Sequence, residues 1–122
     1  MKIGIIIDMD YKDFNTIMLT VKKILLENKN KNTEITFVLG NETPLQKKII
    51  ECMRNKKINV MEFPSENQFK GSFTSVRNIE ILALCKKTYL FCNTNKSYFV
   101  FITKYANFRN YNCEHVLNKK RG

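Results

Sequence analysis

Short apolar runs alternate with amphipathic helical patterns along almost the whole chain, and this alternation is the strongest constraint on its fold. The first run, Lys2–Asp8, is nearly continuously apolar, which is typical of a strand buried on both faces of a parallel sheet. Four later runs of strand-forming residues end near glycine, proline or asparagine or near the end of the chain. These predicted strands are Glu34–Leu39, Asn59–Phe63, Tyr89–Asn93 and Cys113–Leu117.

Helical stripes separate the predicted strands. Apolar residues recur at three- and four-residue steps over Phe14–Leu25, and Asp10 or Asp13 is expected to cap the start of this helix. Thr43 followed by Pro44 is typical of a helix N-cap and first turn, so a second helix is predicted there. A third helix is predicted to begin near Thr74, with Val76, Ile79, Leu82 and Ala83 facing inward.

The segment Tyr98–Thr103 is open to two interpretations. It consists of strand formers, so Thr94–Ser97 could be a hairpin turn between two strands. The residues Phe99, Ile102 and Tyr105 nevertheless keep a helical step. We favour the helix, because it also completes the alternation of strands and helices.

The alternation predicts an α/β fold: a Rossmann-like three-layer domain with a mostly parallel five-stranded sheet. Residues 1–117 form this single domain, and residues 118–122 form a basic tail. In such a sheet, ligands bind outside the carboxyl ends of the strands, where the winding direction reverses. The predicted crevice is therefore lined by Asp8–Asp13, Gly40–Thr43, Pro64–Ser75 and Asn93–Ser97.

The chain carries 21 Lys and Arg against 11 Asp and Glu, a formal net charge of +10. Such an excess is typical of proteins that bind nucleic acid, although the abundance of Lys, Asn and Ile also fits an AT-rich genome. Most of the charge falls near predicted helix ends, opposite the crevice, whereas acidic residues predominate at the crevice rim. The helix-end cations are Lys22, Lys23, Lys29, Lys31, Arg54, Lys56, Lys57, Lys86, Lys87 and Arg109; the rim holds Asp8, Asp10, Asp13, Glu42, Glu62 and Glu66 against Lys12, Lys70, Arg77 and Lys96.

We expect a cytoplasmic protein without a membrane span, because no apolar stretch approaches about 20 residues. The first apolar run is also too short for a signal peptide and is followed by aspartates. No C-x-x-C pair occurs, and His115 is the sole histidine, so no metal site is predicted. The cysteines, expected to be reduced and mostly buried, are Cys52, Cys85, Cys92 and Cys113.

Several common chemistries lack their motifs. The chain has four glycines and contains neither G-x-G-x-x-G nor G-x-x-x-x-G-K-[ST], which excludes the usual dinucleotide and P-loop cofactor sites. No cofactor is therefore expected. A nucleophilic triad or dyad would have to use His115, which has no motif around it and is interpreted as a core or edge residue. The carboxylates Asp8, Asp10, Asp13 and Glu80 could serve as acid and base, or as helix caps and ion-pair partners.

The pair Arg77-Asn78 is the most informative motif. It falls in the first turns of the predicted third helix, where a guanidinium and an amide could reach into the crevice. The alternative is a surface arginine paired with Glu80, three residues later on the same helix.

The order of these features resembles the SLOG superfamily (the SMF/DprA and LOG group of Rossmann-like domains), most closely its small YspA or cpYpsA-related branch. The chain has Ile7-Asp8-Met9 where family members carry a Gly-Ser-Arg turn, and Gly40-Asn41-Glu42-Thr43-Pro44 where they carry a glycine-rich loop. The resemblance implies a pocket for nucleotides or nucleotide-derived signals, of the kind found in bacterial and phage conflict systems. It covers about Met1 to Leu117, and its segments are Met1–Ile6, Asp10–Phe14, Val38–Gly40, Val60–Pro64, Val76–Leu82, and Lys96-Ser97 leading into Phe101–Ala106.

These observations favour a divergent, non-catalytic domain that binds a nucleotide, a nucleotide-derived ligand or a protein partner. A basic accessory protein that binds nucleic acid without sequence preference is the alternative, and a nucleoside hydrolase or transferase using Asp8 or Glu80 is the second alternative. We also expect a homo-oligomer, because Tyr98, Phe101 and Phe108 cannot all face one core from a single helix. The predicted ligand-binding residues are Asp8, Asn41, Arg77, Asn78 and Asn93.

Overall fold

The computed structural model describes residues 1–8, 11–63, 72–92 and 97–117, and of residues 72–76, 97–99 and 117 it describes the backbone alone. Five strands and four helices alternate along the described residues. The strands are β1 (Lys2–Ile7), β2 (Thr36–Leu39), β3 (Asn59–Glu62), β4 (Lys87–Cys92) and β5 (Cys113–Leu117); the helices are α1 (Phe14–Glu27), α2 (Pro44–Asn55), α3 (Ser72–Leu84) and α4 (Ser97–Phe108).

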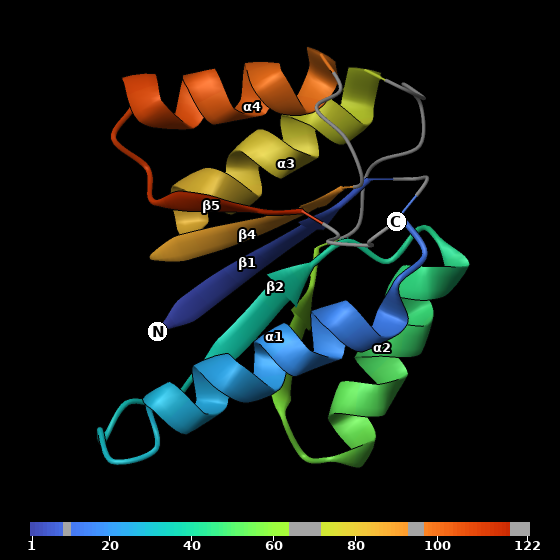
Figure 1. The fold of residues 1–122 in the computed structure, drawn as a ribbon, viewed down its shortest axis with the longest axis vertical. Coiled ribbons are helices and arrows are strands. Elements are labelled where there is room, and N and C mark those ends of the chain that lie inside the picture. The colour runs from blue at the N-terminus through green and yellow to red at the C-terminus, as the bar shows by residue number, and fades with distance from the viewer. Residues whose placement is uncertain (9–10, 64–71, 93–96, 118–122) are drawn as a thin grey trace.

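The strands form one sheet in the order β3-β2-β1-β4-β5, and every neighbouring pair is parallel. Helices α1 and α2 cover one face and α3 and α4 cover the other (Figure 1). The predicted Rossmann-like three-layer fold is therefore confirmed. The segment Tyr98–Thr103 lies within α4, so the helical interpretation is also confirmed, and β4 pairs with β1 and β5 rather than with a hairpin partner.

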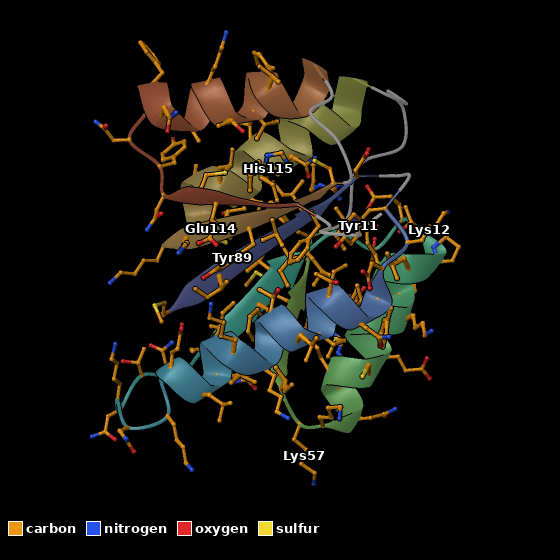
Figure 2. The ribbon with its side chains drawn as sticks, in the orientation of Figure 1. Tyr11, Lys12, Lys57, Tyr89, Glu114 and His115 are labelled. Carbon is orange, nitrogen blue, oxygen red and sulfur yellow. The ribbon has the colours of Figure 1, made fainter. Side chains whose placement is uncertain are left out.

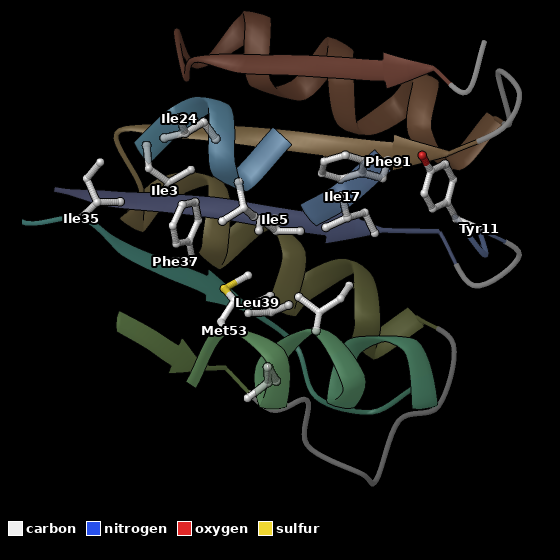
Figure 3. Packing of buried hydrophobic residues seen from close by; sticks show 13 residues of the cluster. Ile3, Ile5, Tyr11, Ile17, Ile24, Ile35, Phe37, Leu39, Met53 and Phe91 are labelled. Carbon is white, nitrogen blue, oxygen red and sulfur yellow. The ribbon is translucent and has the colours of Figure 1, made fainter. Parts of the chain in front are cut away.

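Two cores fill the space between the layers. Because side chains alternate along a strand, Ile3 and Ile5 of β1 face α1 and α2, whereas Ile6 faces α3 and α4. The first core is larger and includes Tyr11, whose ring packs against Phe91 with the centroids 5.8 Å apart (Figure 3). Two hydrophobic layers therefore hold the sheet from both sides, which explains why the central strand β1 is so uniformly apolar.

The helix starts follow the predicted capping chemistry. Asp13 caps α1, since its Oδ1 accepts a hydrogen bond from the backbone N–H of Thr16 at 3.0 Å. Thr43 caps α2 in a capping box: its Oγ1 accepts from the N–H of Gln46, and the Gln46 Oε1 accepts from the N–H of Thr43. Both caps hold the turns that leave the carboxyl ends of β1 and β2, so they also shape the edge where a ligand is expected.

Two local predictions were wrong. Strand β4 begins at Lys87, not Tyr89, so Lys87 does not end a helix; its Nζ forms an ion pair with Glu114 of β5 at 3.0 Å. Helix α3 presents Ile81 to the core, whereas Ala83 is exposed, because the buried stripe runs through residues 78, 81 and 82.

In the described part of the chain, no helix is both long and apolar enough to cross a membrane.

Candidate ligand site at the carboxyl edge of the sheet

The winding of the sheet reverses between β1 and β4. From β1 the chain moves outward to β2 and β3, and it then crosses over to β4 and β5 on the other side. Ligands of doubly wound sheets bind at the carboxyl edge beside such a reversal. The polar side chains that follow the strand ends there are therefore the first candidates for a site.

Arg77 of α3 is buried at this edge and paired with a carboxylate. Its side chain is 4% exposed, and its Nη2 lies 2.8 Å from Glu42 Oε2 while its Nη1 donates to Glu42 Oε1 at 3.0 Å. Nη1 also donates to the carbonyl oxygen of Phe63 at 3.2 Å. The predicted surface pair of Arg77 with Glu80 is therefore wrong: the partner lies 35 positions away along the chain, and Glu80 is exposed.

Asn78 completes the cluster around the guanidinium. Its Oδ1 accepts a hydrogen bond from Arg77 Nε at 2.8 Å, and the Asn78 side chain is itself buried. All three nitrogens of the guanidinium are thus used, two of them on one carboxylate in the planar, bidentate geometry for which arginine is suited. We call Gly40, Glu42, Phe63, Arg77 and Asn78 the arginine cluster.

Gly40 leaves the space in which the ion pair lies. A Cβ at this position would fall 2.7 Å from Arg77 Cζ, and closer still to Arg77 Nη1 and Glu42 Oε1. Any side chain at position 40 would therefore displace the guanidinium or the carboxylate. Gly40, at the end of β2, thus makes room for the ion pair of the arginine cluster and is not part of a phosphate-binding loop.

The electrostatic balance of the cluster is neutral. The Arg77 guanidinium is removed from water, whereas the Glu42 side chain is 30% exposed and lies toward solvent. Burial of an unpaired cation would be costly, so Glu42 stabilises Arg77 where it stands. A ligand at this edge therefore meets the carboxylate first and reaches the guanidinium only by replacing it.

Asn41 turns away from the arginine cluster although it precedes Glu42. Its Nδ2 donates to Glu62 Oε1 at 2.7 Å, and the other oxygen of Glu62 lies 2.6 Å from Arg54 Nη1. These hydrogen bonds from Asn41 and Arg54 lower the pKa of Glu62. The three side chains line a groove of about 380 Å³ beside α2, together with Lys47, Ile50, Glu51 and Asn55.

Asp8 occupies a third position, at the reversal itself. Its backbone N–H donates to the carbonyl of Phe91 at 2.9 Å, and its own carbonyl accepts from the N–H of Tyr11 at 3.0 Å. Asn93 lies outside the described residues. Of the five predicted ligand-binding residues, the structure brings Arg77 and Asn78 together, places Asn41 in the groove beside α2 and leaves Asp8 at the turn after β1.

A thiol–imidazole contact lies farther along the same edge. Cys92 Sγ, at the end of β4, is 2.6 Å from His115 Nε2 on β5. Leu90 is the register partner of His115, so Cys92 lies two residues beyond it on the same face. The sequence interpretation of His115 as an isolated core or edge residue missed this contact. Among the described residues, no group of three or more His, Cys, Asp or Glu is arranged to hold a metal ion.

The two edges of the sheet differ in charge. The carboxyl edge comprises the described residues from the last residue of each strand to the start of the next helix. Four of them are acidic (Asp8, Asp13, Glu42 and Glu62) and Lys12 is basic. The opposite, amino edge comprises Met1–Ile3 and the segments from the last residue of each helix to the second residue of the next strand. It holds eight basic and three acidic residues: Lys2, Lys29, Lys31, Lys56, Lys57, Lys86, Lys87 and Arg109 against Glu27, Glu34 and Glu114.

Figure 2 shows the two edges at the ends of α2, with Lys12, at the carboxyl edge, beside its start and Lys57, at the amino edge, beyond its end. The predicted placement of most basic residues away from the crevice agrees with the topology, because every connection from a helix into a strand lies at the amino edge of an all-parallel sheet.

Comparison of the chain with protein-family models, with curated proteins and with solved structures finds no match.

Proposed function

We propose that the chain is a non-catalytic binding domain that takes a small, oxyanion-bearing ligand at the arginine cluster. The observation that carries the proposal is the buried, bidentate contact of Arg77 with Glu42 over Gly40, at the edge where Rossmann-like sheets bind their ligands. A guanidinium fork of this kind matches the geometry of a carboxylate or a phosphate. The resemblance to the SLOG superfamily supports a nucleotide-type ligand.

Binding at this site is an exchange of one oxyanion for another. Glu42 is the more exposed partner of the pair, and the backbone carbonyl of Phe63 and the amide of Asn78 hold Arg77 from its other sides. A ligand phosphate or carboxylate would take the two Nη positions while Arg77 stays in place. Because Glu42 competes for the same two nitrogens, affinity for the ligand is set by the difference between the two interactions.

The contacts favour binding over bond-breaking chemistry. Both carboxylate oxygens of Glu42 accept from Arg77, and the Asn78 carbonyl oxygen accepts from Nε, so these groups position one another. The arginine cluster thus resembles a recognition site with an internal anion.

Calorimetric titration with inorganic phosphate, AMP and adenosine tests the proposal. Glu42→Gln removes the charge of the internal competitor, and we expect it to tighten AMP binding about tenfold, or about 1.4 kcal/mol. Arg77→Lys keeps a cation but loses the fork, and we expect at least a tenfold loss. The matched control is Arg54→Lys, in the exposed pair with Glu62, which should leave the affinity unchanged.

Circular dichroism of each variant separates loss of binding from loss of fold. The proposal is wrong if folded Glu42→Gln binds neither phosphate nor AMP, or if Arg77→Lys binds as the natural chain does. Binding of adenosine alone would also contradict it, because the ligand would then not use its oxyanion.

The basic amino edge supports a second candidate, binding of a nucleic-acid backbone without sequence preference. Eight basic side chains converge there from segments far apart in the sequence, against three acidic ones. Phosphate contacts of this kind release counterions, so affinity should fall steeply with salt. A second surface for a different ligand is compatible with a small-molecule site at the carboxyl edge.

Fluorescence anisotropy of a labelled single strand of about 20 nucleotides tests this candidate, with the salt series as the diagnostic readout. The double variant Lys56→Glu/Lys57→Glu reverses two charges at the amino edge and should weaken binding at least fivefold. Lys47→Glu/Lys48→Glu makes the same change in net charge near the start of α2 and is the control. Equal loss in both double variants would show a general charge effect and would contradict a site at the amino edge.

A further inference from the structure

Cys92 and His115 are brought together by the register of two parallel strands. Strand β5 pairs with β4 so that His115 lies opposite Leu90, and the side chain of Cys92 follows on the same face of the sheet. Figure 2 shows His115 on the side of β5 that faces α3. The resulting distance of 2.6 Å between Sγ and Nε2 is a direct contact between a nucleophile and a base.

The other thiols provide the comparison. Burial raises the pKa of Cys85 to about 12 and that of Cys113 to about 11. Such thiols stay protonated and inert at neutral pH. Cys92 is as deeply buried, with 0% of its surface exposed, but it contacts an imidazole that can accept its proton. Cys52, in α2, is half-exposed.

Access to the sulfur is restricted. His115 is half-buried on β5, which is an edge strand of the sheet, whereas Cys92 has no exposed surface. Small reagents are therefore favoured over protein-sized ones. This position is separate from the arginine cluster, which lies beyond the ends of β2 and β3.

We propose that Cys92 is an imidazole-activated thiol and a modification site for small, soft electrophiles, namely low-molecular-weight disulfides. His115 Nε2 accepts the Sγ proton, and the thiolate attacks one sulfur of the disulfide. The bond between the two sulfurs of the reagent breaks as the bond to Cys92 forms. The departing thiolate takes the proton from the imidazolium and leaves as a thiol, so Cys92 is oxidised and half of the reagent is reduced.

The experiment treats the full chain with excess oxidised glutathione over pH 6.5–8.5 and measures modification of each cysteine by mass spectrometry. For an ordinary thiol with a pKa near 8.5, the rate falls about 50-fold between pH 8.5 and 6.5. We expect the Cys92 rate to fall less than about fivefold over this range, because the imidazole keeps the thiolate populated. Cys52, in the same molecule, is the internal control, and its rate should fall more steeply than that of Cys92.

The variant His115→Gln should slow modification of Cys92 at pH 6.5 at least tenfold and leave Cys52 unchanged. The proposal is overturned if Cys92 and Cys52 share one pH profile in the natural chain, or if Cys92 stays unmodified while Cys52 reacts. Equal Cys92 rates in the natural chain and in folded His115→Gln would overturn it too. The pH profile of the natural chain decides the matter even where the variant fails to fold.

Discussion

Gly40 and Arg77 meet across the carboxyl edge, where the missing side chain of one residue is the space that the guanidinium of the other fills. The two residues come from the end of β2 and from α3, and Glu42 lies with them. The glycine is therefore required by a side chain of another element and not by a turn of its own. This relationship explains how a chain without a glycine-rich loop still needs a glycine at this edge.

Gly40→Ala should destabilise the protein by about 1–3 kcal/mol, because the added methyl group overlaps the paired side chains. Urea unfolding followed by circular dichroism measures the change. Glu42→Gln/Gly40→Ala is the informative double variant. Because a weakened Arg77–Glu42 pair is displaced more easily by the methyl group, the double variant should lose less stability than the two single variants lose together. Unchanged stability in Gly40→Ala would contradict the close packing of the cluster.

Gly4 has a corresponding role under α3. A Cβ there would fall 2.6 Å from Thr88 Oγ1 and 2.7 Å from Ile81 Cγ2, so the helix lies as close to β1 as a bare backbone allows. Gly4→Ala should cost about 1–3 kcal/mol. Thr88→Ala removes one of the two overlapping side chains, so the pair of substitutions should show a favourable coupling in a double-mutant cycle. Simple additivity of the two free energies would argue against contact between the sites.

The cap of α2 is expected to contribute about 1 kcal/mol. Thr43→Ala removes the hydroxyl group that accepts a hydrogen bond from the backbone N–H of Gln46, so this N–H loses its acceptor. The free energy of unfolding should fall by about 0.5–2 kcal/mol in urea titrations. Thr33→Ala, at an exposed loop position, is the control and should change the stability by less than about 0.5 kcal/mol.

The buried thiol of Cys85 makes stability depend on alkaline pH. Its pKa is raised by burial from 9.0 to about 12, so the unfolded chain releases this proton at lower pH than the folded chain. The contribution of the protonated Cys85 thiol to the free energy of unfolding is therefore fully present below pH 9 and is lost as the pH rises toward 12. Cys85→Ala should show a shallower decline of stability between pH 9 and 11 than the natural chain.

Cys52→Ala is the matched control for that experiment, because Cys52 is half-exposed. It should retain the steep decline. The same slope in Cys85→Ala and Cys52→Ala would mean that other groups govern the alkaline transition.

The expected homo-oligomer would form through the outer face of α4. Phe101 is 52% and Phe108 is 81% exposed, while the side chain of Tyr98 lies outside the described residues. Phe101→Lys/Phe108→Lys should lower the molar mass measured by light scattering at high protein concentration, because it places charge on that apolar face. A monomeric mass for the natural chain at every concentration would refute the expectation.

Much of the fold followed from local patterns. The steps of three and four residues in α1 and the capping residues Asp13 and Thr43 determined where helices begin, because those signals act within one turn. The uniformly apolar run of β1 indicated a parallel sheet covered on both faces, since only such a strand must bury both sides. The alternation of the two patterns then predicted the three layers.

The candidate sites depended on the tertiary structure. Sequence distance favoured Glu80 as the partner of Arg77. Burial of α3 against the sheet removes the guanidinium from solvent and requires a carboxylate in contact with it, which Glu42 supplies. The strand register, which depends on packing of whole helices, placed Cys92 beside His115 across 23 positions. The sequence by itself determined the elements and their order, because these follow from local propensity and periodicity. The side-chain partners at the carboxyl edge were decided only when distant elements packed together, because each partner is selected by burial and register rather than by separation along the chain.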